Sequence, residues 1–487
     1  MNDIHSDFWR DIIENHPLEY FKKIVQIPHR STDETNICQS LIYFAQQHCL
    51  HWEKDEAGNL LIQKEGTTTQ KQFPVILQAH MDMVFETEDI VQYPYEKAIH
   101  MIQQGDIVKA KGTSLGADNG LGIAIILAIL ASKNLQHPSI EALFTVEEED
   151  GLIGASKIQK NWLRGKYLIN LDGEEENVVV AGCAGAFRSE IQLPIVLEKI
   201  EQHRYFMLQI CGIYGGHSGL DIHKNRKNAI VLLQRLLIDI YKEITIRICK
   251  LDGGSRMNAI PTKAEAVIAV PESLVSLLGR KILELEKEIK VDLIKEDMNF
   301  KFSFSEVLEQ KCCNAETTKN IFQIFSEIPN GILERYDNKI NSVKTSSNVG
   351  IVETKDNMMI WISNTRSSSK NSLDKIMQQK QTLANKSNAN VIFDSYYPAW
   401  EYQKHSSLRE LYIKIYEKLY SNKLHINVIH AGLECGILLE KFSDIDAISV
   451  GSNIWDVHSV SEHFSKASFE RIWNVIQKVL LKLCEKE

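Results

Sequence analysis

The sequence predicts an α/β fold with a largely parallel sheet, followed by an α+β unit and then a return to the α/β pattern. Three observations support this prediction. Short apolar runs alternate with helical patterns up to about Phe187, strand-rich segments dominate from there to residue 387, and a strand and helices follow from Asn388. Such alternation is typical of parallel strands that are covered by helices.

The first part of the chain combines short amphipathic helices with buried strands. Apolar residues spaced by three and four between residues 6 and 50 predict the helices. A glycine-rich loop opens into an apolar run at residues 123–130, which predicts a buried helix, and we expect Asp118 or Asn119 to cap its start. Brief apolar runs bounded by polar or turn-forming residues predict strands at residues 60–63, 74–78, 106–110, 140–146 and 167–171.

The middle and last parts of the chain carry the remaining elements. In the middle part, we expect a helix at residues 229–243 and strands at residues 190–193, 206–210 and 264–270. In the last part, we expect a strand at residues 391–394 and helices at residues 407–419 and 469–484. No low-complexity segment or short repeat interrupts these patterns, so we expect both parts to be folded.

The composition is that of a globular protein, and it excludes several classes of function. The chain has 487 residues, with 55 Lys and Arg against 64 Asp and Glu and a net charge of −9, so it lacks the basic clusters that bind a nucleic-acid backbone. The longest apolar run, residues 121–131, is too short to span a membrane. Residues 1–10 have no signal-peptide layout. We therefore expect a cytoplasmic protein without a nucleic-acid or membrane partner.

The cysteines argue for a reducing environment. Nine cysteines follow no regular spacing and form no CxxC motif, so they do not suggest a disulfide framework. We expect the adjacent Cys312 and Cys313 to be two reduced thiols.

Acidic and imidazole side chains stand at the ends of several predicted strands. Because active residues of α/β folds gather where strands end and loops begin, these side chains are candidates for one site. Histidine nitrogen and carboxylate oxygen bind zinc and similar divalent ions, and two such ions can share one bridging carboxylate. The candidates are His80 and Asp82, then Asp118, then Glu147, Glu148 and Glu149, then Asp172, and His458 near the end of the chain.

Each candidate also has an ordinary structural interpretation. A single histidine after a strand is commonly solvated, Asp118 could be only a helix cap, and the run from Glu147 to Asp150 could be a solvated charge patch. Asp172 precedes a glycine and could be a turn residue. The coincidence of several acidic and imidazole clusters at strand ends of one α/β unit favours a divalent metal site.

A series of motifs then occurs in the order and spacing of a known family. The motifs are QAHMDMV, KGTSLGADNGLGIA, TVEEEDGLIGA, INLDGE, GCAG, GGHSGLDIHKNRKNA, DGGSRMNAIP, TRSSS, YYPAW, IHAGLECG and WDVHS. Over nearly its whole length the chain resembles the di-zinc metallopeptidases related to carboxypeptidase G2, and most closely the aminoacyl-histidine dipeptidases.

This resemblance implies a domain organisation and a pair of metal ions. A zinc-peptidase-like catalytic domain, with a mixed sheet flanked by helices, would comprise residues 1–186 and 388–487. An inserted α+β lid domain would comprise residues 187–387. The cofactors would be two divalent ions, zinc in the first place, with manganese or cobalt as alternatives. Asp118 would bridge the two ions, and the other ligands would be His80, Glu149, Asp172 and His458.

The resemblance also implies catalytic roles. Glu148 would be the general base, and Glu147 receives no role. Asp82 would hold the imidazole N–H of His80 and so fix the tautomer that binds the metal. His217 would stabilise the developing oxyanion. Because neighbouring residues of a strand face opposite sides of the sheet, Glu148 and Glu149 are expected to lie in a loop rather than on a strand.

Three further residues resemble groups that bind the substrate. Arg366 and Asn258 would hold its terminal carboxylate, for which an arginine fork is well shaped, and His430 would donate or accept a hydrogen bond. The alternatives are a surface salt bridge for Arg366 and a turn residue for Asn258. For His217 the alternative is a polar loop residue. Tyr397 is expected to belong to the core.

The expected function is that of a cytosolic metallo-dipeptidase that hydrolyses Xaa-His dipeptides such as carnosine. Closure of the lid would exclude bulk water during the reaction. A tripeptide aminopeptidase or an N-acyl amino acid deacylase is the nearest alternative, and a catalytically silent binding protein is the alternative from another class. A homodimer is expected from the resemblance alone.

Overall fold

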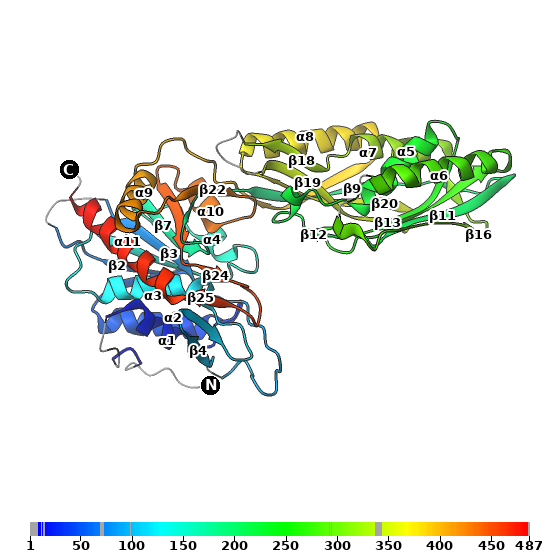
Figure 1. Cartoon of the computed structure of the whole chain (residues 1–487). Helices are drawn as coiled ribbons and strands as arrows, with labels where there is room; N and C mark the ends of the chain where they lie inside the picture. Colours follow the sequence, from blue (N-terminus) through cyan, green and yellow to red (C-terminus); the bar gives the residue numbers. More distant parts are fainter. Residues whose placement is uncertain are drawn as a thin grey trace. The chain divides into compact units, whose positions relative to one another are not determined.

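The structure is a computed structural model that divides into two compact units (Figure 1). It describes residues 8–10, 12, 15–68, 73–97, 99–291, 293, 295–336 and 343–485. Residues 1–7, on which part of the signal-peptide interpretation rests, lie outside the described residues. Unit 1 comprises Met1–Gly182, Tyr402–Val428 and Leu433–Glu487. Unit 2 comprises Cys183–Glu401 and Ile429–Gly432.

Unit 1 is built on an eight-stranded mixed sheet in the order β1-β2-β6-β3-β7-β23-β8-β22. The four inner strands β6, β3, β7 and β23 run parallel, while β1, β2 and β8 pair antiparallel with their neighbours. The carboxyl ends of β3, β6 and β7 therefore lie at one edge of the sheet. The strands are β1 (His51–Lys54), β2 (Leu60–Lys64), β3 (Val75–His80), β6 (Ile140–Thr145), β7 (Tyr167–Gly173), β8 (Val178–Cys183), β22 (His425–Ile429) and β23 (Asp446–Gly451).

Helices and a small second sheet complete unit 1. The small sheet has the order β24-β25-β5-β4, with β4 (Met101–Gln104), β5 (Ile107–Ala110), β24 (Ile454–Trp455) and β25 (His463–Ser465). The helices are α1 (Pro17–Ile24), α2 (Thr35–Gln47), α3 (Ala117–Ala131), α4 (Ile153–Lys157), α9 (Ser407–Tyr420), α10 (Glu434–Lys441) and α11 (Lys466–Cys484). The strands and helices predicted for this unit are present, with ends shifted by a few residues.

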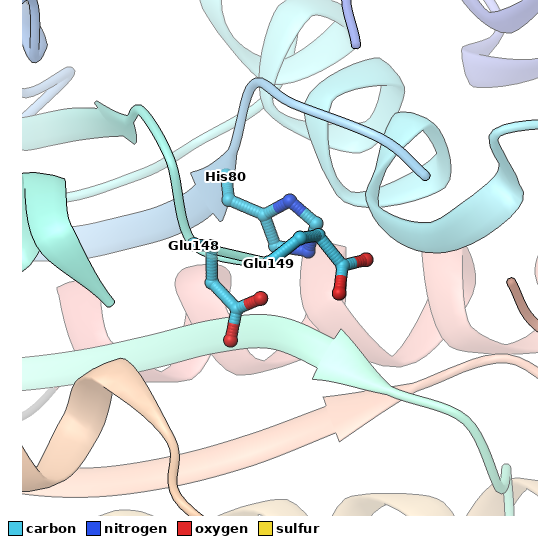
Figure 2. A group of neighbouring side chains, drawn as sticks. All are labelled: His80, Glu148 and Glu149. Carbon is cyan, nitrogen blue, oxygen red and sulfur yellow. The ribbon is translucent and has the colours of Figure 1, made fainter. Parts of the chain in front are cut away.

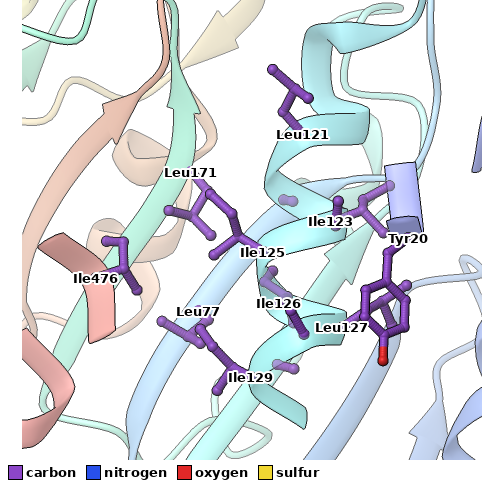
Figure 3. Close-up of a cluster of buried hydrophobic side chains, with 14 of the residues drawn as sticks. Tyr20, Leu77, Leu121, Ile123, Ile125, Ile126, Leu127, Ile129, Leu171 and Ile476 are labelled. Carbon is purple, nitrogen blue, oxygen red and sulfur yellow. The ribbon is translucent and has the colours of Figure 1, made fainter. Parts of the chain in front are cut away.

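Helix α3 is the centre of the core of unit 1. It is apolar on all sides because α1 covers one face and the strands β3 and β7 cover another. Figure 3 shows Ile125 and Ile129 of α3 beside Leu77 of β3 and Leu171 of β7, with Ile476 of α11 close by. Full burial of each such side chain stabilises the fold by about 1.5–3 kcal/mol. This packing fixes α3, and with it the loop that carries Asp118.

The predicted cap of this helix is wrong. Gly116, in a left-handed conformation with φ of 73°, occupies the N-cap position and supplies no side-chain hydrogen bond. Asp118 and Asn119 have non-helical backbone angles, and the peptide bond between them is cis. The free backbone N–H groups at this end are instead bound by the carboxylate of Glu462, which lies more than 340 residues further along the chain.

Unit 2 is built on a nine-stranded sheet in the order β16-β11-β15-β13-β19-β20-β9-β21, with β18 paired to β19. Neighbouring strands of this sheet pair antiparallel, as expected for an α+β unit. The strands are β9 (Gly185–Pro194), β11 (His203–Cys211), β13 (Arg247–Gly253), β15 (Ala264–Pro271), β16 (Lys301–Val307), β18 (Gly331–Arg335), β19 (Val343–Lys355), β20 (Met358–Ser367) and β21 (Asn390–Tyr397).

Helices and two short ladders complete unit 2. The helices are α5 (Ala229–Tyr241), α6 (Val275–Val291), α7 (Ala315–Glu327) and α8 (Lys370–Lys386). The ladders pair β10 (Leu197–Glu198) with β17 (Cys312–Cys313), and β12 (Gly216–His217) with β14 (Ala259–Ile260). Cys312 and Cys313 are free thiols, as predicted.

The assignment of residues 187–387 as a lid domain stays a prediction. In the structure, the second unit begins at Cys183 and extends to Glu401, because β21 pairs with β9 in its sheet. None of the helices in the described part of the chain combines the length and apolarity that crossing a bilayer demands.

Candidate active site

The candidate metal-binding residues of unit 1 come from five segments. His80 is the last residue of β3, Asp172 lies near the end of β7, and Glu148 and Glu149 follow β6. The two glutamates lie in a loop, as predicted, because Glu147 has a left-handed backbone with φ of 50° and turns the chain. Figure 2 shows both side chains beside the ring of His80. The remaining two segments are the start of α3, with Asp118, and the connection between β24 and β25, with His458.

Asp118 lies between the two histidines. Its Oδ1 is 3.1 Å from Nε2 of His80, and its Oδ2 is 3.3 Å from Nε2 of His458. Oδ1 of Asp172 is 3.2 Å from the same nitrogen of His80, and Oε1 of Glu149 is 2.7 Å from Nε2 of His458. Each oxygen of Asp118 therefore faces a different histidine–carboxylate pair. We call Asp118, Glu148, Glu149 and Asp172, with His80 and His458, the acidic cluster.

The donor atoms of the acidic cluster fit divalent metal ions. His80, Asp118 and Asp172 form one group whose ligand atoms all lie within 4.8 Å of one another, and Asp118, Glu149 and His458 form a second. Asp118 belongs to both groups, as a bridging carboxylate must. Oε1 of Glu149 is buried and makes no hydrogen bond, although it lies close to His458. A cation would satisfy a buried carboxylate oxygen that makes no hydrogen bond.

The pKa values of the acidic cluster also fit the binding of a cation. Burial raises the pKa of Asp172 to about 7, and the neighbouring carboxylates of Asp118 and Glu149 add to this effect. Burial also raises the pKa of Glu148 well above its usual value. A hydrogen bond to Asp118 and the nearby negative charge of Glu149 raise the pKa of His458 to about 11. Crowded carboxylates thus draw protons in the absence of a cation, and a cation would displace those protons.

Asp82 is buried below the acidic cluster, but it contacts His80 differently from the prediction. Nδ1 of His80 is 2.9 Å from the backbone carbonyl oxygen of Asp82 and 3.5 Å from its carboxylate. The carboxylate instead accepts hydrogen bonds from the backbone N–H groups of Glu148 (3.0 Å) and Glu149 (3.2 Å) and from the hydroxyl of Ser31 (2.8 Å). Asp82 therefore holds both the imidazole tautomer and the glutamate loop.

Two residues in unit 1 make contacts that the sequence did not predict. Nδ2 of Asn119 donates to Oδ1 of Asp172 at 2.9 Å and so orients that carboxylate. Glu434 is fully buried and accepts hydrogen bonds from Gln78 at 2.5 Å and Thr145 at 2.8 Å, both of which belong to the strands that end at the acidic cluster. Burial raises the pKa of Glu434 to about 8.

In unit 2, His217 is held in one neutral tautomer. Its Nδ1 accepts hydrogen bonds from the backbone N–H groups of Gly219 (3.2 Å) and Leu220 (3.0 Å). The ring proton therefore lies on Nε2, which is left to act as a donor. Burial and the charge of Arg366 lower the pKa of His217, so the ring stays neutral at pH 7.

Arg366 and His430 lie next to His217 around Gly219. A Cβ atom at Gly219 would approach the carbonyl oxygen of His430 to 2.9 Å, Nε of Arg366 to 3.1 Å and Cε1 of His217 to 3.2 Å, so a residue without a side chain is needed there. Arg366 donates to the hydroxyl of Tyr397 at 2.7 Å. Nε of Arg366 and Nδ1 of His430 are buried without a hydrogen-bond partner. We call His217, Arg366 and His430 the basic cluster.

The remaining predicted residue, Asn258, makes a backbone hydrogen bond next to the basic cluster. Its carbonyl oxygen accepts a hydrogen bond from the backbone N–H of Ser218 at 2.8 Å, next to the β12–β14 ladder. Its side chain is exposed. Tyr397, which was expected to be a core residue, is instead a partner of Arg366, and the aromatic residue types of its motif gave no signal of this contact.

Comparisons with known proteins agree with this geometry. The model of the peptidase family M20/M25/M40 matches residues 76–482. The chain is 33% identical to the cytosol non-specific dipeptidase of Escherichia coli K12 over 469 residues, which are 96% of this chain and 97% of the relative.

The comparison of structures gives similar matches. The crystal structure of aminoacylhistidine dipeptidase from Vibrio alginolyticus superimposes with a TM-score of 0.90 and 32% identity over 98% of this chain and 99% of that chain. The crystal structure of aminopeptidase PepT from Bacillus cereus has a TM-score of 0.57 at 14% identity, over 98% of this chain and 100% of that chain. At that identity the likeness concerns the fold alone.

Proposed function

The chain belongs to the peptidase family M20/M25/M40 and is a peptide hydrolase, and from this premise we propose that it is a cytosolic dipeptidase with two divalent metal ions. The single observation that carries the proposal is the position of Asp118, whose two oxygens face different histidine–carboxylate pairs. The names of the relatives from E. coli and V. alginolyticus, both dipeptidases, support the reaction class.

We propose that His80, Asp118 and Asp172 hold one ion and that Asp118, Glu149 and His458 hold the other. The donor set contains imidazole nitrogen and carboxylate oxygen without cysteine, which suits zinc and also accepts manganese or cobalt. When bound, the two ions supply Lewis acidity that polarises the scissile carbonyl group and acidifies a water molecule.

Glu148 is the proposed general base. Its carboxylate belongs to the acidic cluster, and its backbone is fixed by the hydrogen bond to Asp82. Glu148 would take a proton from the attacking water and deliver it to the nitrogen of the leaving amine. Asp82 acts in this proposal as a positioning residue, since its carboxylate holds the loop and its carbonyl oxygen holds His80.

We assign substrate recognition to unit 2. Nε2–H of His217 would stabilise the negative charge that develops on the carbonyl oxygen in the transition state. Arg366 would bind the terminal carboxylate of the dipeptide, for which its buried and unpaired Nε is available. His430 and Asn258 would complete this recognition. Closure of the lid is part of the same proposal.

The finer proposal is a preference for Xaa-His dipeptides such as carnosine. The name of the V. alginolyticus relative supports it, whereas the name of the E. coli relative favours a broader range of dipeptides. A tripeptide aminopeptidase or an N-acyl amino acid deacylase remains the alternative within the superfamily. A homodimer is a further proposal that rests on the sequence resemblance.

Metal analysis combined with a substrate panel tests the proposal. We expect the purified protein to bind two zinc ions and to hydrolyse β-alanyl-histidine, and we expect a chelator to abolish this activity until zinc is restored. The panel should include Xaa-His dipeptides, other dipeptides, tripeptides and acylated amino acids. Faster turnover of tripeptides or acylated amino acids would replace the dipeptidase assignment, and full activity after complete metal removal would refute the two-metal mechanism.

A further inference from the structure

The carboxylate of Glu462 occupies the N-terminal end of α3 as completely as one side chain can. Its Oε2 accepts the backbone N–H groups of Leu115 (2.6 Å) and Gly116 (2.8 Å), and its Oε1 accepts those of Ala117 (2.8 Å) and Asp118 (3.2 Å). The residue is 2% exposed. Because the first N–H groups of a helix have no partner within the helix, this carboxylate satisfies those of Gly116, Ala117 and Asp118, together with the N–H of Leu115 just before the helix.

Glu462 also belongs to the turn that carries His458. Its backbone N–H donates to the carbonyl oxygen of Ser459 at 3.1 Å, which closes the turn just before β25. His458 and Asp456 both have left-handed backbones, with φ of 58° and 53°. Such conformations are costly for residues other than glycine and persist where surrounding contacts impose them. The contacts of Glu462 anchor one side of this turn.

Glu462 is not itself a candidate ligand. Both of its oxygens are fully used by backbone N–H donors, and the three candidate metal groups found among the described residues do not include it. A further carboxylate close to Asp118 would repel the acidic cluster unless donors compensated its charge. The helix end provides that compensation, because its N–H groups and dipole favour an anion.

We infer that Glu462 is a positioning residue. It holds the loop of Asp118 next to the turn of His458, so that both side chains reach the same metal ion. This inference rests on the two-metal site proposed above. Asp118 and His458 are 340 residues apart in the sequence, and Glu462 joins their two segments through four hydrogen bonds. Loss of these bonds would release both ligands from one ion together.

The test compares zinc binding by metal-free variants. Glu462→Gln keeps the shape of the side chain but turns an NH₂ group toward backbone N–H donors, and Glu462→Asp keeps the charge on a shorter side chain. Glu141→Gln is the matched control, because Glu141 is also 2% exposed and also accepts backbone N–H groups, from Arg164 and Gly165. It lies at the opposite end of β6 from the acidic cluster.

Zinc affinity is measured by titration against a competing chromophoric chelator. We expect the unmodified chain and Glu141→Gln to bind two ions each, and we expect the affinities of Glu141→Gln to equal those of the unmodified chain. Glu462→Gln should bind the weaker ion about 10- to 100-fold less tightly, the usual effect of losing a residue that supports metal ligands, and Glu462→Asp should lie between. Urea unfolding of the metal-free proteins should show losses of stability in Glu462→Gln and Glu141→Gln alike.

Two results would overturn the inference. If Glu462→Gln binds both ions with unchanged affinity, whatever its stability, then Glu462 is only a structural cap. If Glu462→Gln does not fold, unchanged affinity in Glu462→Asp has the same meaning. An unmodified chain that binds fewer than two ions would instead refute the proposed function itself and this inference with it.

Discussion

The two units gather opposite charges. The acidic cluster of unit 1 brings four carboxylates around two histidines, whereas the basic cluster of unit 2 brings an arginine and two histidines together around Gly219. Burial acts on them in opposite directions, because it raises the pKa of Asp172 to about 7 and lowers the pKa of His430 to about 3. In both clusters, burial and like charges disfavour the charged state.

This difference indicates what each cluster binds. In the acidic cluster, Oε1 of Glu149 is a buried acceptor that makes no hydrogen bond, so a cation would satisfy it. Among the orphaned atoms of the basic cluster, Nε of Arg366 is a donor, so an anion would satisfy it. Folded proteins seldom keep such atoms without compensation. We therefore propose that unit 1 binds the metal ions and that unit 2 binds the carboxylate of the substrate.

The largest expected effect comes from breaking the chemistry of the acidic cluster without removing its ions. Glu148→Gln keeps the size of the side chain but cannot accept the proton of water, so kcat should fall by about 10³-fold or more. Zinc content should stay at two ions, because Glu148 belongs to neither of the two groups that share Asp118. The measurement is kcat for β-alanyl-histidine together with metal analysis of the same sample.

The neighbouring glutamate provides the control for this prediction. Glu147→Gln should retain normal kcat, since no role is assigned to that side chain. Near-normal turnover in Glu148→Gln would remove Glu148 as the general base, and loss of zinc would make it a ligand instead.

The next effect concerns the neutral donor of the basic cluster. His217→Ala removes the Nε2–H that is proposed to stabilise the oxyanion, so kcat should fall by about 10²- to 10³-fold while KM changes little. His203→Ala, which removes a partly exposed histidine on β11 of the same unit, should leave both constants unchanged. A rise in KM with normal kcat would place His217 in ground-state binding rather than at the oxyanion.

A smaller effect is expected for carboxylate binding. Arg366→Gln removes charge-assisted hydrogen bonds worth about 1.5–3 kcal/mol, so KM should rise by about 10- to 100-fold. Tyr397→Phe removes only the acceptor that orients Arg366 and should raise KM by about 2- to 10-fold.

An arginine on a neighbouring strand serves as the control. Arg188 forms ion pairs with Glu190 and Asp394 on the same sheet, and Arg188→Gln should leave KM unchanged. Equal rises of KM in Arg366→Gln and Arg188→Gln would mean that arginine loss disturbs the sheet rather than substrate binding.

The sequence predicted the parts of the fold and of the acidic cluster that depend on local patterns. Apolar runs located β3, β6 and β7, so the residues that follow them were expected at one edge of the sheet, where His80, Glu148 and Asp172 indeed meet. The predicted cap of α3 was wrong because a distant carboxylate, that of Glu462, replaced the nearest polar side chain.

Contacts across long sequence separations left no local signal. The partners Arg366 and Tyr397 are separated by 31 residues, and the three ranges of unit 1 are separated by segments of unit 2. Spacing rules describe one helix or one strand, whereas such contacts depend on how strands are ordered in a sheet. Motif resemblance named His80, Asp118 and His458 as ligands and Asp82 as the support of His80, but it gave no indication that Glu462 holds the loop of Asp118.

The last test concerns Lys380, for which we expect no effect on turnover. It asks whether burial alone, without any role in substrate binding, shifts the pKa of a side chain in unit 2. This lysine of α8 is fully buried and donates hydrogen bonds to the hydroxyls of Ser189 (2.8 Å), Ser363 (2.7 Å) and Thr365 (2.8 Å). Burial lowers its pKa to about 7. Between about pH 7 and pH 10.4 the unfolded chain therefore holds a proton that the folded chain lacks, so the free energy of unfolding should rise with pH across this range.

The rise in the free energy of unfolding should be on the order of 4 kcal/mol, and Lys380→Met should abolish it because methionine does not titrate. In this variant the hydroxyls of Ser189 and Ser363 still bond to each other. Urea unfolding midpoints at pH 7, 8.5 and 10 measure this difference, with Lys386→Met, an exposed lysine of the same helix, as the control. Turnover at pH 7 should be unchanged in both variants, since neither lysine belongs to the basic cluster. If the unfolding midpoints of the unmodified chain and of Lys380→Met change with pH in parallel, burial does not discharge Lys380 in the folded chain.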